Sequence, residues 1–137
     1  MSKSARIVVD LPFPVSVNRI WRAGRKFVYR SPQYKDWQGE AYAVWLQQKL
    51  TLPVKKIAGC YSLEIVLAEP DNRLRDLGNY EKVLSDFIQS VGLIENDRLC
   101  RRLVMEYGDS DDAPLGCRLT IQSLGNTKCR GETTGYE

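Results

Sequence analysis

The order of strand-like and helix-like patterns along the chain is the strongest constraint on its fold. Two segments repeat apolar residues at helical spacing, and four short segments are rich in β-forming residues and bounded by turn residues. The helical segments cover residues 31–50 and about 76–91, and the strand-like segments cover residues 5–11, 59–68, 99–107 and 115–124. This order, β-α-β-α-β-β, predicts a two-layer α+β fold that combines a mixed β-sheet with two helices.

Capping residues mark the ends of the two predicted helices. Ser31 followed by Pro32 is a typical N-cap with proline at the first helical position. Gly92 is well placed to end the second helix. The last two strands, joined by the loop GDSDDAP, are expected to pair with each other, and the run RAGRKFVY at residues 22–29 suits either a flexible loop or a small hairpin.

The length of 137 residues, with 43% hydrophobic residues, suits one domain with a real core. We expect residues 1–124 to form that domain and residues 125–137, which lack apolar periodicity, to form a flexible tail. No segment resembles a signal peptide or a membrane span, so we expect a cytoplasmic protein without membrane contact. In that compartment its four cysteines would be reduced and mostly structural.

The chain contains no histidine, and its four cysteines show no CxxC spacing. The missing imidazole excludes the Ser-His-Asp triad, the Cys-His dyad and a histidine general base. The cysteine spacing argues against a zinc site. An enzyme built on this chain therefore depends on carboxylates, lysine, hydroxyl groups or a bound metal.

Charge is divided unevenly along the chain. Residues 1–60 hold eleven Lys and Arg against three Asp and Glu, whereas residues 61–112 hold six against twelve. Residues 11–35 contain six basic residues and no acid, which suits an arm that grips a polyanion, although ordinary scatter explains the division equally well. The basic residues of this arm are Arg19, Arg22, Arg25, Lys26, Arg30 and Lys35, and Trp21, Phe27 and Tyr29 lie between them as stacking surfaces or as the edge of the core.

The stretch RLRDLGNYEKVLSD, residues 73–86, concentrates charge at the expected start of the second helix. Taken singly, Asp76 suits a helix cap and Lys82 with Asp86 suits a surface pair at i, i+4. Asp97 lies after the same helix and would therefore be at the opposite end from Asp76. The two acids converge only if the loop of Asp97 folds back, or if it begins a strand beside the second strand.

Three separated pieces of the sequence together resemble the RusA family of Holliday-junction resolvases, endonucleases that cut four-way DNA junctions. The family motif R-D-L-D-N, with a lysine three residues on and then an amphipathic helix, a glycine and an aspartate, is similar to RDLGN-x-x-K and the residues after it in this chain. The early LPFPVSVN-x-x-W, with Asn18 and Trp21, resembles the opening segment of the family. The matching positions are Arg75, Asp76, Leu77, Asn79, Lys82, Gly92 and Asp97, and the resemblance spans roughly residues 7–124.

This resemblance implies hydrolysis of phosphodiester bonds with Mg²⁺, or Mn²⁺ in its place, by a homodimer bound to a four-way junction. It implies that Asp76, Lys82 and Asp97 are catalytic, with Lys82 as a charge aimed at the phosphate or the nucleophile. The residues that it implies for DNA contact are Arg75, Asn79 and Asn18, in addition to the basic arm.

One departure from the family pattern bears on the reaction. Three carboxylates normally gather the metal in this family, but the usual second aspartate is Gly78 here. Asp76 and Asp97 then need a third ligand, for which Glu81 is the candidate. Without a substitute acid, the resemblance implies a protein that binds junctions with weakened or lost cleavage. A third interpretation, an unrelated α+β interaction module whose acids are caps, leaves the spacing and the charge division as coincidences.

Overall fold

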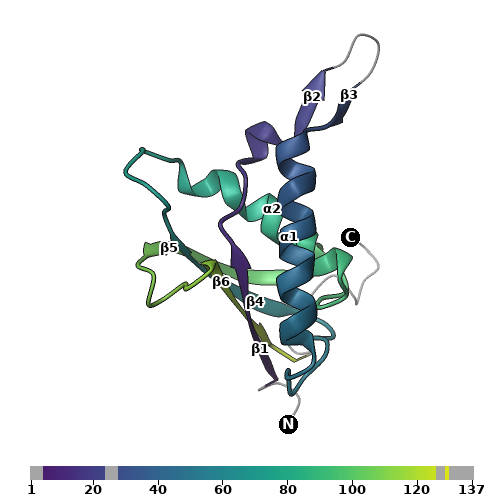
Figure 1. Cartoon of the computed structure of the whole chain (residues 1–137). Helices are drawn as coiled ribbons and strands as arrows, with labels where there is room; N and C mark the ends of the chain where they lie inside the picture. The colour runs from purple at the N-terminus through teal and green to yellow at the C-terminus, as the bar shows by residue number, and fades with distance from the viewer. Residues whose placement is uncertain (1–4, 24–27, 126–128, 130–137) are drawn as a thin grey trace.

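The chain folds into a four-stranded mixed β-sheet, a separate two-stranded ribbon and two α-helices (Figure 1). These elements are seen in a computed structural model that describes residues 5–23, 28–125 and 129. The strands are β1 (Arg6–Pro12), β2 (Trp21–Ala23), β3 (Val28–Arg30), β4 (Tyr61–Ala68), β5 (Cys100–Gly108) and β6 (Gly116–Ser123). The α-helices are α1 (Pro32–Lys49) and α2 (Glu81–Ser90), and the 3-10 helices are η2 (Val17–Arg19), η3 (Leu77–Tyr80) and η4 (Asp97–Leu99).

The four-stranded sheet has the order β1-β6-β4-β5. β6 runs antiparallel to both of its neighbours, whereas β5 runs parallel to β4. The prediction that the last two strands pair with each other is therefore wrong, because β4 lies between them. The physical reason is burial: Leu63, Ile65 and Leu67 of β4 are fully buried and suit a central strand, whereas most side chains of β5 are exposed or half-buried and suit an edge.

The first helix begins as predicted. Pro32 is its first residue, and the Ser31 hydroxyl accepts a hydrogen bond from the Tyr34 N–H at 3.1 Å. The two helices form one layer against the sheet. Trp37 of α1 packs edge to face on Phe87 of α2, with ring centroids 5.7 Å apart. The opposite face of the sheet carries polar side chains, among them an ion pair between Asp10 and Arg118. This arrangement confirms the predicted two-layer α+β fold.

The second helix begins later than predicted. The stretch from Leu77 to Tyr80 forms the 3-10 turn η3, and α2 starts at Glu81, so Lys82 lies at its second residue. Gly78 weakens a regular helix at this point, whereas the Asp76 side chain caps the tighter turn by accepting from the Gly78 N–H at 3.3 Å. The helix ends at Ser90, and Gly92 terminates it as predicted, since this residue has a φ of 84°, which glycine adopts readily.

The basic arm contains a small antiparallel ribbon, which confirms the hairpin alternative for its two strands. β2 pairs with β3, with Trp21 opposite Arg30, and the ribbon projects beyond the start of α1 (Figure 1). Residues 24–27 lie outside the described part of the chain. The base of the ribbon is tied to α1 because the Ser31 hydroxyl donates to the Arg19 carbonyl at 2.5 Å.

The structure joins Cys60 to Cys129 in a disulfide, with the two Cα atoms 5.4 Å apart. The expectation of four reduced thiols is therefore wrong for this pair, while Cys100 and Cys117 are free. Of the predicted tail, only Gly125 and Cys129 are described. In the described ranges, neither helix has the length and apolar character needed to cross a bilayer.

Candidate functional site

The N-terminal proline-rich segment and the RDLGN motif line the same open cleft, which has a volume of about 570 Å³. These segments are far apart in the sequence, and each supplies polar side chains to the same hollow. The residues that line it include Phe13, Asn18, Arg19, Gln33, Arg75, Asp76 and Asn79. The structure thus brings together two of the three motif pieces identified in the sequence.

Asn18 and Arg19 belong to the short helix η2 on one side of this cleft. The Ser16 hydroxyl caps the helix by accepting from the Asn18 N–H at 3.2 Å, and the next residue after the helix, Ile20, is buried in the core. Both Asn18 and Arg19 are exposed, so their side chains face solvent at the cleft. They are available for contact with a phosphate backbone.

Asp76 lies across the cleft in an extended backbone conformation just before η3. Its carboxylate accepts from the Gly78 N–H at 3.3 Å, and its carbonyl accepts from the Asn79 N–H at 3.0 Å. Asp76 is exposed, and Asn79 beside it is half-buried in the cleft wall. The capping role predicted for Asp76 is confirmed, and the remaining carboxylate oxygen is left to bind a ligand.

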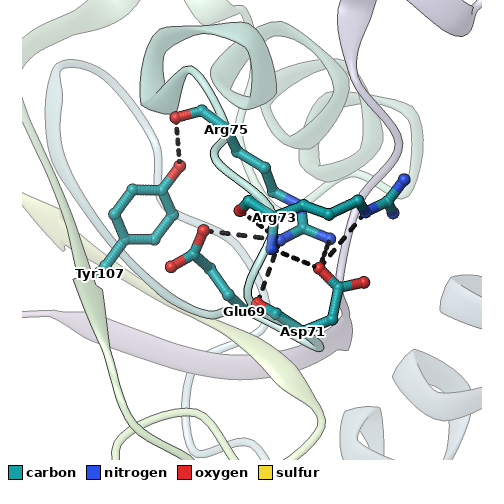
Figure 2. A network of polar contacts seen from close by, with 5 residues as sticks. All are labelled: Glu69, Asp71, Arg73, Arg75 and Tyr107. Atoms are coloured by element: carbon teal, nitrogen blue, oxygen red, sulfur yellow. Dashed lines mark hydrogen bonds and ion pairs between the residues drawn. The ribbon is translucent and has the colours of Figure 1, made fainter.

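Arg75 is held by the protein rather than left free. Its side chain is only 9% exposed, with Nη2 lying 2.8 Å from Asp71 Oδ1 and Nη1 lying 3.5 Å from Glu69 Oε2 (Figure 2). Burial alone would lower the pKa of Arg75, but hydrogen bonding to Asp71 raises it, so the guanidinium stays charged. The guanidinium also lies 5.3 Å from the Phe13 ring centroid. Arg75 therefore fixes the shape and charge of the cleft wall, and its predicted contact with DNA stays a prediction.

Tyr107 of the edge strand β5 contacts the loop that carries Arg75 and Asp76. The phenol of Tyr107 donates to the Arg75 carbonyl at 3.4 Å (Figure 2). Burial raises the pKa of Tyr107, and the nearby carboxylates of Glu69 and Asp76 raise it further, so the phenol keeps its proton as a donor. The position of Asp76 is thus fixed by a strand that comes later in the chain.

Lys82 connects the start of α2 to the residue that precedes β5. Its ammonium group lies 3.0 Å from Asp86 Oδ1, which confirms the predicted i, i+4 pair, and 3.7 Å from Asp97 Oδ2. Hydrogen bonding to Asp86 raises the pKa of Lys82, with a further contribution from Asp97, so the amine stays protonated. Asp97 is also held by its own N–H, which donates to the Gln89 side chain at 2.9 Å.

Asp76 and Asp97 are positioned by different ends of β5: Tyr107, near the end of this strand, donates to the carbonyl of Arg75 next to Asp76, whereas Asp97 lies just before the start of the strand. Asp97 lies in η4 directly before β5, and β5 runs parallel beside β4, the second predicted strand. Asp97 therefore leads into a strand beside the second predicted strand, which is one of the two conditions that the sequence set for convergence, while the convergence of the two carboxylates stays a prediction. Asp97 lies beside Lys82 and Gln89 of α2, whereas Asp76 lines the cleft.

Glu81, the candidate third acid, points toward the sheet. Its carboxylate accepts from the buried Ser85 hydroxyl at 2.5 Å. Burial raises the pKa of Tyr61, and the nearby Cys100, Asp97 and Glu81 add to the effect. The Tyr61 hydroxyl is fully buried and has no hydrogen-bond partner among the described residues. Glu81 and Asp97 thus lie on one side of α2, around an unsatisfied hydroxyl.

The donor chemistry of these residues fits a hard divalent cation, since carboxylate oxygens are the ligands that Mg²⁺ prefers. The side chains do not, however, form a complete metal site. Across the described ranges, no three Asp, Glu, Cys or His side chains form a group suited to a metal ion. The missing aspartate accounts for part of this shortfall. A Cβ built on Gly78 would lie 3.8 Å from Asp76 Oδ1, so a carboxylate at position 78 would stand beside Asp76.

The basic ribbon is described only in part. Arg25 and Lys26 lie outside the described residues, and only the backbone of Arg22 is described, so their predicted DNA contacts stay predictions. Arg30 is exposed, and its guanidinium donates to the Gln38 side chain at 3.4 Å. Trp21 is 56% exposed beside it, which keeps an aromatic surface available for stacking.

Several residues near the site were not singled out from the sequence. Gln33 and Arg73 line the cleft, and Tyr61 borders the acids at the other side of α2. Arg73 belongs to the same charged run as Asp76, so its sequence position was an available signal. No comparable signal marks Gln33 or Tyr61, because their proximity to the acids depends on tertiary packing.

Comparison with known proteins identifies relatives of this chain. The family model described as endodeoxyribonuclease RusA matches residues 12–122. A crossover junction endodeoxyribonuclease RusA from Aquifex aeolicus (strain VF5) is 37% identical over 91 residues, which cover 65% of this chain and 68% of that protein. A protein of the same name from Enterobacteria phage HK97 is 30% identical over 87 residues, covering 64% of this chain and 70% of that protein.

Proposed function

The chain belongs to the RusA family of endodeoxyribonucleases, and we propose that it resolves four-way DNA junctions by Mg²⁺-dependent cleavage as a homodimer. The relatives from Aquifex aeolicus and phage HK97 carry the name crossover junction endodeoxyribonuclease, which supports junction DNA as the substrate. A cytoplasmic location suits this substrate. The proposal extends to the residues of this chain that would carry the reaction.

The observation that carries the proposal is the shared cleft. Asp76, which matches the first aspartate of the family motif, lines the same hollow as Asn18 and Arg19 from the N-terminal segment. A phosphate bound by Arg19 and Asn18 would therefore be next to a carboxylate able to hold a cation. This arrangement suits a nuclease better than it suits a helix cap with no further role.

Asp76 and Asp97 are the residues that would hold Mg²⁺, with Glu81 as the third carboxylate. When bound, the cation neutralises charge on the scissile phosphate and lowers the pKa of a water molecule. Asp97 is already fixed by its contacts with Lys82 and Gln89, so its carboxylate needs little reordering. Glu81 has to exchange its hydrogen bond from Ser85 for the metal.

Lys82 supplies a permanent positive charge beside these acids. Its side chain is 57% exposed, and its protonation is secured by Asp86 and Asp97. In the reaction it would stabilise the negative charge that develops on the phosphate. Arg75 acts as a positioning residue, because its guanidinium is engaged by Asp71 and Glu69.

A homodimer is expected from the symmetry of the substrate. Resolving a four-way junction requires two strands to be cut at related positions. An isologous pair of subunits places two equivalent sites around a twofold axis, which is the common solution for such a task.

Cleavage of a synthetic four-way junction with Mg²⁺ tests the proposal. We expect the wild-type chain to nick two opposed strands, and we expect Asp76→Asn and Asp97→Asn to lose about 10²- to 10³-fold in rate. Equal cleavage by all three proteins would contradict the assignment, since it would mean that another site, or a contaminant, cuts the DNA. Sedimentation of the free protein tests the homodimer independently of activity.

A second candidate function is favoured by Gly78. With no carboxylate at this position, the chain would bind junctions while cutting them slowly or not at all. This alternative predicts tight, salt-sensitive junction binding without nicks. Robust cleavage by the wild-type protein would eliminate it.

A further inference from the structure

A second, smaller cleft of about 280 Å³ lies between α1 and α2 near the base of the ribbon. Residues from the first two turns of α1 form one wall, and residues from the C-terminal half of α2 form the other. All of the side chains that line it carry a polar group. They are Arg30, Tyr34, Gln38, Asp86, Gln89 and Ser90.

The two glutamines present hydrogen-bond donors to this second cleft. The Gln38 side-chain oxygen accepts from the Arg30 guanidinium at 3.4 Å, and the Gln89 side-chain oxygen accepts from the Asp97 N–H at 2.9 Å. Because both oxygens are engaged in this way, the NH₂ groups of both amides are left to donate.

Asp86 and Tyr34 complete the polar surface. Asp86 supplies a carboxylate acceptor, since only one of its oxygens is paired with Lys82. Tyr34 is 5% exposed, and it forms part of the cleft wall. Burial raises the pKa of Tyr34, and the charge of Asp86 raises it further, so this phenol remains a donor. A phenol in the cleft wall can donate a hydrogen bond to a ligand there.

This second cleft shares its walls with the proposed catalytic residues. Asp86 contacts Lys82 at 3.0 Å, and the Gln89 side chain holds the N–H of Asp97. A group bound between α1 and α2 would therefore contact Asp86 and Gln89, which in turn contact Lys82 and Asp97, the lysine and the acid that are proposed to act on the scissile phosphate.

We propose that this second cleft binds one unstacked nucleobase of the junction, of the class that carries an exocyclic amino group. A carboxylate accepts a hydrogen bond from such an amino group, while amide NH₂ groups donate to ring nitrogen or carbonyl acceptors of the base. The volume lies just below the range of about 300–1,000 Å³ typical of small-molecule pockets, so it suits a single base rather than a longer segment of strand. Thymine has no amino group and would leave Asp86 without a donor.

This inference rests on the proposed function, because the base comes from a bound junction. It adds a source of sequence preference that the phosphate contacts of the large cleft do not provide. Enzymes that act on nucleic acids commonly move a base out of the stack into a fitted pocket, at a cost of a few kcal/mol.

Junctions that carry 2-aminopurine near the crossover test the inference without depending on cleavage. This base has an exocyclic amino group, and its fluorescence rises when it leaves the stack. We expect wild-type protein to raise the emission several-fold at one labelled position. Gln38→Ala and Tyr34→Phe should suppress this rise while junction affinity stays within about threefold of wild type. Gln47→Ala, an exposed glutamine farther along α1, is the matched control and should behave as wild type.

A cleavage series gives the second readout. Thymine at the responsive position should slow wild-type cleavage by at least about fivefold, and Gln38→Ala should reduce this discrimination toward unity. Junction binding with no rise in emission at any position, or an equal rise in Gln38→Ala and Tyr34→Phe, would overturn the inference alone. Failure of the wild-type protein to bind junctions would overturn the proposed function and this inference with it.

Discussion

The ammonium group of Lys82 lies 3.7 Å from Oδ2 of Asp97, which links the first turn of α2 to the residue that leads into β5. Lys82 is the second residue of α2, and Asp97 follows this helix in η4, which leads into β5 beside β4. The contact places a positive charge beside a carboxylate, on the helix that follows the segment of Asp76. The expected effect of changing Lys82 depends on this contact.

Removing the charge of Lys82 should reduce cleavage much more than binding. In Lys82→Met the side chain keeps its length but loses the ammonium group, so stabilisation of the phosphate charge is lost. We expect a fall of about 10²- to 10³-fold in the cleavage rate, with junction affinity changed by less than about threefold. Single-turnover cleavage and a gel-shift titration measure the two effects.

Lys56→Met serves as the matched control, because Lys56 is an exposed lysine in the connection between α1 and β4. It should leave both quantities close to wild type. A parallel loss of rate in both variants would show that general charge, rather than the position of Lys82, is responsible.

Gly78→Asp should strengthen metal binding. The backbone at Gly78 does not need glycine, since its φ is not positive, and the new Cβ would meet only Asp76 Oδ1, at 3.8 Å. A second carboxylate beside Asp76 raises the local charge that attracts a cation. We expect the Mg²⁺ concentration for half-maximal cleavage to fall at least about tenfold, equivalent to about 1.4 kcal/mol. Titration of cleavage and of Mn²⁺ binding against metal concentration measures the change.

Gly39→Asp is the control for this substitution. Gly39 lies in α1 and, like Gly78, has room for a side chain, so the variant adds the same charge away from the cleft. If it shifts the metal dependence as much as Gly78→Asp, then net charge rather than local geometry explains the effect.

The elements of this fold are readable from local pattern, but their arrangement is not. Ser31, Pro32 and Gly92 predict helix ends because capping depends on nearby backbone groups. The neighbours of β5 depend instead on which strand takes the central position of the sheet, and that is decided by the whole sheet. The sequence therefore predicted the strand but paired it with β6.

The candidate site likewise combines features that follow from residues close in sequence with features that depend on tertiary packing. The residues from Arg75 to Lys82 are recognisable because they are close in sequence, whereas the ion pair of Arg75 with Asp71 forms in a loop, where the helical spacing rule does not apply. The position of Asp97 beside Lys82 could not be derived, because it requires the parallel register of β4 and β5. The disulfide of Cys60 with Cys129 joins residues 69 apart, and no spacing rule predicts that pairing.

Acid should destabilise the loop that carries Arg75. The N–H of Arg73, together with the guanidinium of Arg75, lowers the pKa of Asp71 from 3.8 to about 2. A depressed carboxyl pKa stabilises the folded state above the pKa of the unfolded chain, and that stabilisation is lost as the pH falls through the folded value. The contribution is therefore present above about pH 4 and disappears toward about pH 2.

Asp71→Asn tests this pH dependence, because the amide does not titrate. We expect the melting temperature of the variant, monitored by circular dichroism, to fall less than that of wild type between about pH 5 and about pH 2. Glu106→Gln, an exposed carboxylate on the edge strand β5, provides the control and should keep the wild-type slope. Identical slopes for wild type and Asp71→Asn would refute the role assigned to this ion pair.

The disulfide should stabilise the purified protein. Cys60 precedes the central strand β4, and its bond to Cys129 closes a loop between residues 69 apart, which limits the freedom of the unfolded chain. A bond of this kind contributes about 2–4 kcal/mol, so a reductant should lower the melting temperature by roughly 5–15 °C. Alkylation of the denatured protein without reductant tests whether the bond forms, and it should modify only Cys100 and Cys117, the two free cysteines. The double variant Cys60→Ser/Cys129→Ser should melt at the same temperature with and without reductant. Four alkylated cysteines in the untreated protein would mean that the bond does not form, as a reducing cytoplasm would favour.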